Sequence, residues 1–163
     1  RENEAFSEAA YDSALETMWL TFRAELADRL ADLSVGHPLE VTALWTEMFG
    51  PQPSISFCRN DSGRLQLSLR AVDLYPYPPE QQARLTLIHD LGWQPDDGWE
   101  LADTEYCLSD FPEREVDAAA LLAERTLREV WDVLDPSFLI SEENEVIRRF
   151  TDPPPQPREP KMR

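Results

Sequence analysis

Hydrophobic residues at helical spacing dominate the first part of the chain. Between residues 15 and 33 leucine and aromatic residues recur at steps of three and four, and charged residues occupy the positions between them. Apolar residues at this spacing form one stripe along a helix. The pattern predicts a helix of about five turns that ends near Gly36. Trp19 and Phe22 lie on its stripe and are expected to face a core.

A period of two follows in the next part of the chain. Residues 39–48, 54–57 and 64–71 alternate between apolar and polar, and the short breakers FGPQP and NDSG separate them. Such alternation is typical of half-buried strands, and short breakers favour an antiparallel meander. The outward positions are small or weakly polar more often than charged: Thr42, Leu44, Thr46, Ser54, Ser56, Cys58, Gln66, Ser68 and Arg70.

A second helix is expected after the proline-rich segment LYPYPPEQQ, and it should run to Leu91. A left-handed Gly92 just past its end would bring Trp93 against the last turn, near Ile88, as in a Schellman motif. We therefore interpret Gly92 and Trp93 as a structural clamp. The acidic turn that follows them reads as a solvated turn.

The last third of the chain predicts two short strands, a long helix and a short one. The strands are Trp99–Leu101 and residues 104–111, and Ser141 is expected to cap the short helix, which runs through Arg149. The stripe of the long helix, which follows Pro112, consists of Val116, Ala120, Ala123, Leu127, Val130, Trp131 and Leu134.

The order of elements, α-β-β-β-α-β-β-α, indicates an α+β fold in which helices pack on one face of an antiparallel sheet. We expect one domain at residues 14–140, preceded by an N-terminal extension at residues 1–13. The short helix at residues 141–150 and an extended, proline-rich tail at residues 151–163 complete the chain.

Charge narrows the choice of partner. The 163 residues include 15 basic and 32 acidic side chains, a formal net charge of −17. This charge repels nucleic acid and anionic membranes and attracts basic protein segments. The first ten residues are acidic and polar where a signal peptide would be basic and then apolar, and no run of about 20 apolar residues could span a membrane. We expect a cytoplasmic protein.

Motifs for chemistry are missing from the sequence. The two cysteines, Cys58 and Cys107, have no CxxC spacing, so neither a zinc site nor a disulfide framework is indicated. A pair between one of these thiols and His89 stays open, although a packed thiol and a histidine at a helix end are more typical. The segment from Asp96 to Glu100 does not have the spacing of a calcium loop. We expect no enzyme activity, no metal and no cofactor.

Several segments in a fixed order carry a resemblance to a known family. They are MWLTFRAELADRLADL, PSISF, GRLQLSL, LIHDLGWQP and LREVWDVLDPSFL, and the most specific are Leu91–Trp93 with Pro95 and Leu127–Leu139 with Pro136. Over about residues 14–140 the chain resembles the actinobacterial TY-Chap family, which joins type III secretion chaperone-like and YbjN-like domains.

The resemblance implies the α-β-β-β-α-β-β-α fold and a chaperone-like domain that binds extended segments of partner proteins, without ATP and commonly as a dimer. The competing hypothesis is an acidic immunity or inhibitor protein that captures a basic partner or mimics nucleic acid. We expect Trp19, Phe22, Leu127 and Trp131 in the core. The outward side of the sheet is then the candidate partner or dimer surface, with Leu44, Ser56, Cys58 and Ser68, and with Trp45 if the first strand twists it toward the edge. The alternative for this face is an ordinary solvent-facing sheet.

Overall fold

A single antiparallel sheet organises the molecule. The computed structural model describes residues 2–44, 52–70, 78–96, 106–143 and 146–150, and its seven strands follow the order β4-β5-β3-β2-β1-β6-β7. The elements are α1 (Glu2–Ala31), β1 (Leu39–Ala43), β2 (Ser54–Arg59), β3 (Leu65–Arg70), α2 (Pro78–Asp90), β4 (Gln94–Pro95), β5 (Tyr106–Phe111), α3 (Val116–Arg125), a π turn η3 (Thr126–Val130), a 3-10 turn η4 (Pro136–Phe138), β6 (Leu139–Glu143) and β7 (Val146–Arg149).

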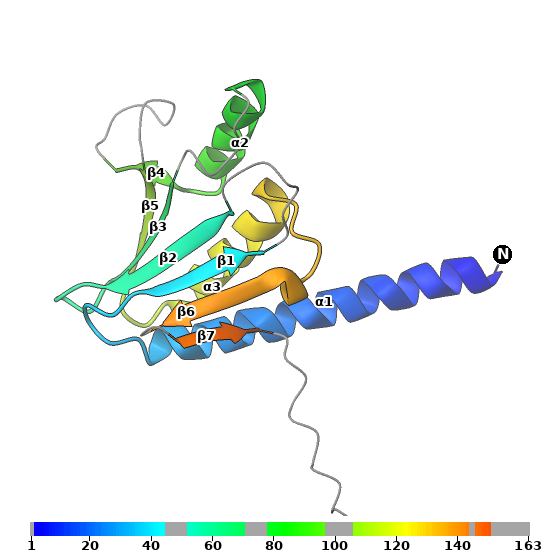
Figure 1. Cartoon of the computed structure of the whole chain (residues 1–163), viewed down its shortest axis with the longest axis horizontal. Coiled ribbons are helices and arrows are strands. Elements are labelled where there is room, and N and C mark those ends of the chain that lie inside the picture. The colour runs from blue at the N-terminus through cyan, green and yellow to red at the C-terminus, as the bar shows by residue number, and fades with distance from the viewer. Residues whose placement is uncertain (1, 45–51, 71–77, 97–105, 144–145, 151–163) are drawn as a thin grey trace, which may run out of the picture.

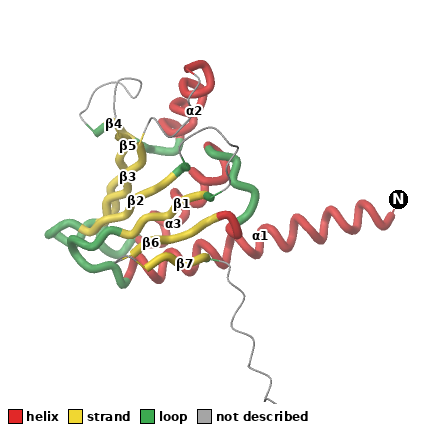
Figure 2. The backbone as a smooth tube through the Cα atoms, in the orientation of Figure 1, coloured by secondary structure: helices red, strands yellow, loops and turns green. Residues whose placement is uncertain are grey.

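Helices α1 and α3 lie on the same face of this sheet (Figure 1). Figure 2 shows α2 at one end of the sheet, where it contacts η3. Along β1, β2 and β3 every second side chain is buried toward the helices. The expected α+β class with helices on one face of an antiparallel sheet is confirmed.

The expected core residues are buried. Trp19, Phe22 and Leu127 have no exposed surface, and Trp131 is 1% exposed. The rings of Trp19 and Phe22 meet edge to face, with their centroids 5.5 Å apart. Both rings belong to α1, and aromatic side chains bury a large apolar area, so they form part of the face that α1 packs into the core.

The clamp at the end of α2 has the predicted geometry. Gly92 has a φ of +104°, and the amide of Trp93 donates to the carbonyl of Ile88 at 3.2 Å. The amide of Gly92 donates to the carbonyl of His89 at 3.0 Å. These two bonds are the Schellman pair, and the Trp93 side chain is fully buried. Asp96 begins the acidic turn and is exposed, as expected, whereas the short strand β4 before it was not anticipated.

Helix α1 is longer than the hydrophobic pattern indicates. It begins at Glu2, well before the start of the apolar stripe near Leu15, and residues 8–14 are all exposed. Its first turns project past the sheet (Figure 1). A periodic stripe reveals only the part of a helix that packs on a core, so the pattern could not locate this start.

The prediction of a C-terminal helix at residues 141–150 is wrong. This segment continues β6 and forms β7, and Val41 of β1 lies opposite Ser141 in the ladder. The ring of Phe150 packs against Phe22 with centroids 4.8 Å apart, and the Arg29 guanidinium lies 4.6 Å from the same ring. Pairing with a distant strand and docking on α1 therefore override the local helical pattern.

The helix after Pro112 also ends earlier than expected. Its α-helical part stops at Arg125, and a π turn follows in which the Trp131 amide donates to the carbonyl of Thr126 at 3.3 Å. The next residue, Asp132, has a φ of +54°. This ends the helix before Leu134, which is 56% exposed instead of lying on the buried stripe. The predictions for Thr46, for Trp99–Leu101 and for the proline-rich tail lie outside the described residues.

Candidate functional site

The second face of the sheet carries no helix within the described parts of the chain (Figure 1). We call it the open face. Its side chains come from every second position of the strands and are half-buried or exposed. Those of the inner strands are Glu40, Thr42, Ser54, Ser56, Cys58, Gln66, Ser68, Arg70, Tyr106 and Leu108.

The strand registers arrange these side chains in rows across the sheet. In the central row Glu40 lies opposite Ser56, and Ser56 lies opposite Ser68. The row continues to Leu108 of β5 on one side and to Glu142 of β6 on the other. Because serine is small, the middle of this row is lower than its two ends.

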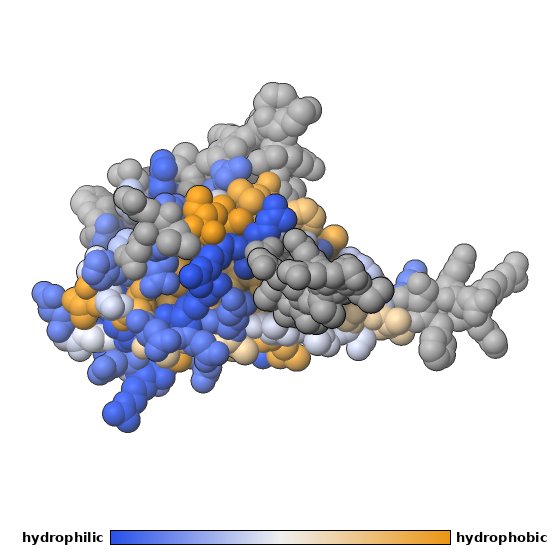
Figure 3. All heavy atoms as spheres, turned by 60° about the horizontal axis from the view of Figure 1, so that its bottom comes forward, coloured by the Kyte–Doolittle hydropathy of each residue, from blue (hydrophilic) through white to orange (hydrophobic). Residues whose placement is uncertain are grey.

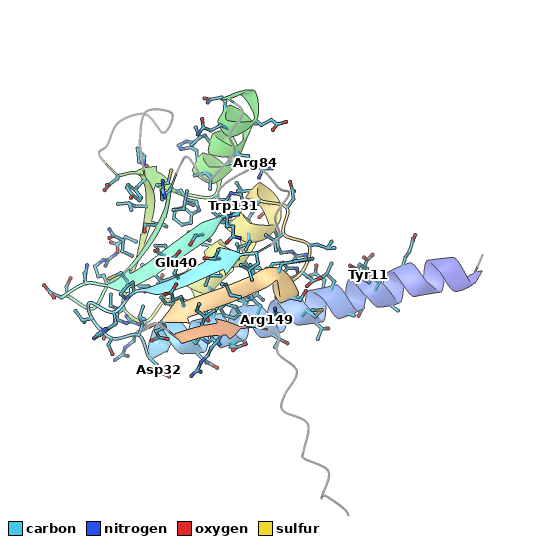
Figure 4. All side chains as sticks on the ribbon, in the orientation of Figure 1. Tyr11, Asp32, Glu40, Arg84, Trp131 and Arg149 are labelled. Atoms are coloured by element: carbon cyan, nitrogen blue, oxygen red, sulfur yellow. The ribbon has the colours of Figure 1, made fainter. Side chains whose placement is uncertain are left out.

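A hollow of about 460 Å³ occupies this part of the open face. This volume lies within the usual range of about 300–1,000 Å³ for ligand pockets. Figure 4 shows Glu40 on the open face, away from α1 and α3. The residues around the hollow are Glu40, Gln52, Ser54, Ser56, Ser68, Leu69, Arg70 and Tyr106.

Opposite charges stand on two sides of the hollow. Glu40 accepts a hydrogen bond of 2.7 Å from the hydroxyl of Ser54, which in turn accepts one of 3.2 Å from the hydroxyl of Thr42. Arg70 ends β3 and lies opposite Tyr106 in the ladder. Within the described residues neither Glu40 nor Arg70 has an ion-pair partner, whereas Arg64 and Asp110 farther along the sheet pair at 2.9 Å. The hollow therefore offers hydroxyl groups on its floor and one charge of each sign that has no ion-pair partner among the described residues.

The described side chains of the open face are mainly hydroxyl, amide and charged groups. In the parts of the chain that the structure describes, no three His, Cys, Asp or Glu side chains are grouped to hold a metal. Cys58 and Cys107 are free, and burial raises the pKa of the Cys107 thiol to about 11. What this face presents is hydrogen-bonding groups and charge, which suits binding.

Four of the five expected surface residues lie on this face, and the structure does not describe the fifth. Ser56, Cys58 and Ser68 are half-buried on it, and Leu44, 38% exposed, continues the outward alternation of β1. Trp45 lies outside the described residues. Three residues of the hollow were missed, Glu40, Gln52 and Tyr106, and Leu69, which also lines it, was assigned to the other face of its strand. The same alternation that places Thr42 outward could have found Glu40, because the two are two positions apart.

Comparison with known proteins decides the family. The family TY-Chap3, described as T3SS (YopN, CesT) and YbjN peptide-binding chaperone 3, matches residues 12–145. The chain belongs to this family. No curated protein and no solved structure matches it.

The TY-Chap3 match covers six of the seven strands and most of the helices that pack on them. It begins within α1 at Asp12 and ends just after β6, so β1 to β6 and the whole hollow lie inside it. Strand β7 and the first turns of α1 lie outside. Among the described helices of this TY-Chap3 chain, none has the length and apolar content needed to cross a membrane.

Hydrophilic residues dominate the side of this TY-Chap3 domain toward β7 and α1, and its hydrophobic areas are small and separate (Figure 3). Ile147 of β7, 63% exposed, is one of the larger exposed hydrophobic residues. Large apolar patches are the usual mark of a permanent subunit interface. The polar hollow on the open face is the candidate site that the described residues offer.

Proposed function

We propose that this TY-Chap3 domain is a non-enzymatic chaperone that binds an extended segment of a partner protein across its open face. The family is one of peptide-binding chaperones, which gives the class of ligand. The observation that carries the proposal is the hollow on the helix-free face, floored by Ser54, Ser56 and Ser68. Hydroxyl groups donate and accept hydrogen bonds, so they suit the amides and carbonyls of an extended chain.

In this proposal one face of the sheet packs the core and the other binds the partner. The large aromatic residues, among them Trp19, Phe22 and Trp131, are buried against the other face and hold the fold together. They are unavailable to a ligand. A partner segment can therefore occupy the open face without opening the core, which explains binding that uses neither ATP nor a large rearrangement.

Charge gives the proposed partner its general character. The formal net charge of −17 attracts basic segments at long range. Such attraction weakens as salt screens it, whereas hydrogen bonds and packing in a hollow persist. Binding that survives high salt supports the chaperone proposal, and binding that disappears supports capture of a basic protein by charge alone.

The test introduces a bulky or charged side chain on the floor of the hollow. Ser56→Arg and Ser68→Glu are made separately, and circular dichroism checks that each variant folds. A library of random 12-residue peptides displayed on phage is then selected against each variant at low and high salt. We expect the wild type to enrich peptides and both variants to lose them, because the new side chains fill the space where the segment lies.

Ser34→Arg and Ser34→Glu are the matched controls. Ser34 is exposed in the loop after α1 and does not line the hollow, so the same changes of charge and size there should leave enrichment intact. If both floor variants fold and enrich the same peptides as the wild type, the site lies elsewhere. The homodimer implied by the family resemblance stays a prediction, and sedimentation of the same variants measures it.

A further inference from the structure

We propose that the hollow selects partner segments by charge at two points: a basic side chain is held at Glu40 and an acidic side chain, four positions away, at Arg70. This inference rests on the proposed function and adds the sequence that the site prefers. It predicts a pattern in the partner, basic-x-small-x-acidic, in which "x" faces away from the sheet.

The carboxylate of Glu40 is placed to receive a cation. Its side chain is exposed on the open face, and the hydroxyl of Ser54 donates to it at 2.7 Å, which helps to fix its position. Glu142 lies directly opposite across the β1–β6 ladder. Like charges at opposed positions repel, so a cation that docks there relieves an unfavourable contact as well as making a favourable one.

Arg70 supplies the opposite charge at the other side. It is exposed, it lines the same hollow, and no described carboxylate pairs with it. A guanidinium has five donors in a fixed plane and binds carboxylates in a bidentate manner. An arginine beside the hollow is poorly suited to a purely basic ligand, even on a protein with a net charge of −17. It favours a segment that also carries an acid.

The geometry of the sheet sets the spacing between the two selected side chains. Glu40 and Arg70 are on strands that lie two places apart, about 10 Å, and Arg70 is offset from the row of Glu40 by two residues, about 7 Å. The diagonal is about 12 Å. An extended segment advances about 3.3 Å per residue and turns alternate side chains to one side, so positions i and i+4 lie about 13 Å apart on the same face.

The middle position of the segment must be small. Halfway along the diagonal, the side chain at i+2 lies over the floor between Ser54 and Ser56. The hydroxyl of Ser54 is already hydrogen-bonded to Glu40, so a large apolar side chain would desolvate this pair without replacing its contacts. Glycine, alanine or serine fits there without that penalty.

Charge-reversal variants of the two residues test the inference. The same phage library of 12-residue peptides is selected against the wild type, Glu40→Lys and Arg70→Glu. We expect the wild type to enrich the pattern above. The peptides that Glu40→Lys selects should carry an acidic residue at i in place of the basic one. Those that Arg70→Glu selects should carry a basic residue at i+4 in place of the acidic one, because like charges at a contact select against a ligand.

A synthetic version of the most enriched peptide gives the magnitude. Its affinity should fall about tenfold for each charge reversal in the protein and recover when the matching charge in the peptide is reversed. Asp61→Lys is the control for net charge. Asp61 is exposed in the turn between β2 and β3, outside the hollow, and its replacement changes the total charge as Glu40→Lys does.

The outcomes separate this inference from the proposed function. If peptides are enriched but Glu40→Lys and Asp61→Lys select the same residues, charge selection at the hollow is overturned while binding on the open face stands. If the library yields no enriched peptide, or if folded Ser56→Arg and Ser68→Glu both enrich the same peptides as the wild type, the proposed function fails and the inference fails with it. If the peptides selected by Glu40→Lys carry an acidic residue at position i, and those selected by Asp61→Lys keep the basic one, the result supports both the proposed function and this inference.

Discussion

The indole Nε1 of Trp93 donates a hydrogen bond of 3.0 Å to the hydroxyl of Thr126, which itself donates to the carbonyl of Leu122 at 2.7 Å. Trp93 and Thr126 are fully buried. Thr126 is the first residue of the π turn, and Trp93 follows the left-handed Gly92 at the end of α2. The clamp thus fixes the end of α2 to the point at which α3 changes its hydrogen bonding.

The Trp93–Thr126 bond should show strong energetic coupling. Thr126→Val leaves the buried indole N–H without an acceptor, which we expect to cost about 1–3 kcal/mol in the free energy of unfolding. Trp93→Phe removes the donor and some buried surface. In urea denaturation the double variant should lose clearly less than the sum of the two single losses. Additive losses would show that the bond contributes nothing specific.

Gly92→Ala should destabilise the fold through backbone conformation alone. A Cβ atom on Gly92 would meet no atom within 4 Å, but its φ of +104° disfavours any side chain. We expect a loss of about 1–2 kcal/mol. Asp96→Ala in the same turn is the control, since Asp96 is exposed and bonds to Tyr106 through its backbone amide. Equal melting temperatures for Gly92→Ala and wild type would contradict the conformational argument.

The sequence predicted those parts of the fold that depend on residues close together in the chain, such as a helix end or the two faces of a strand. The Gly92–Trp93 clamp follows from a left-handed position that glycine fills easily, and the two faces of β2 follow from strict alternation of apolar residues with Ser54 and Ser56. Alternation also assigned Ser68 to the open face. Since side chains alternate with a period of two, one correct register fixes the face of every residue in the strand.

The parts that were missed depend on contacts between distant segments. Strand β6 contains Ser141, Glu142 and Glu143, which have low strand propensity, and it forms because β1 pairs with it. The hollow likewise depends on how β1, β2 and β3 pair, because this pairing brings its lining residues together. Glu40 and Arg70 belong to strands separated by β2, so their common position could be read only after the strand order was known.

Arg59 should be the charged residue on which stability depends most. It is 8% exposed, and its guanidinium donates to the carbonyls of Leu30 at 2.6 Å and Leu33 at 3.0 Å, at the end of α1. It also donates to the carbonyls of Gly63 at 2.8 Å and Glu113 at 3.1 Å. One side chain thus satisfies carbonyls from three separate segments: the end of α1, the turn between β2 and β3, and the loop after β5.

We expect Arg59→Met to lower the free energy of unfolding by more than about 2 kcal/mol, because several buried carbonyls lose a charged donor. The matched control is Arg64→Met. Arg64 pairs with Asp110, but the two side chains are 44% and 50% exposed, so its loss should cost at most about 1 kcal/mol. Chemical denaturation of both variants measures the difference, and equal losses would refute the role given to Arg59.

The two cysteines should differ sharply in reactivity. Burial raises the pKa of the Cys107 thiol to about 11, and its side chain has no exposed surface, whereas Cys58 is half-buried on the open face. The thiolate is the reactive form. A thiol reagent at mildly alkaline pH should therefore label one cysteine in the native protein and both after unfolding.

Cys58→Ser identifies the labelled residue, since native labelling should disappear in that variant. Rapid labelling of Cys107 in the folded protein would show that β5 opens readily.

Two glutamates that share Arg128 should respond to pH with opposite signs. The Oε1 of Glu16 lies 2.6 Å from the Arg128 guanidinium, whose hydrogen bond and charge lower the pKa of this carboxyl below its usual value. Glu124 lies 3.8 Å from both Arg128 and Arg23, but it is buried, and its desolvation outweighs the two arginines and raises its pKa.

A raised pKa means that the folded state favours the protonated carboxyl. Glu124 therefore stabilises the fold fully only below its ordinary pKa of 4.5, and this contribution is lost as the pH rises through the folded value. Glutamine imitates the protonated form, so Glu124→Gln should match the wild type in acid and be more stable at neutral pH.

For Glu16 the stabilisation is present above pH 4.5 and is lost as the pH falls, so Glu16→Gln should be less stable than the wild type at neutral pH and equal in acid. Urea denaturation of both variants on either side of pH 4.5 measures these differences. A Glu124→Gln protein that is less stable than the wild type at neutral pH would show that its two arginines, and not its desolvation, decide the energy of this buried carboxylate.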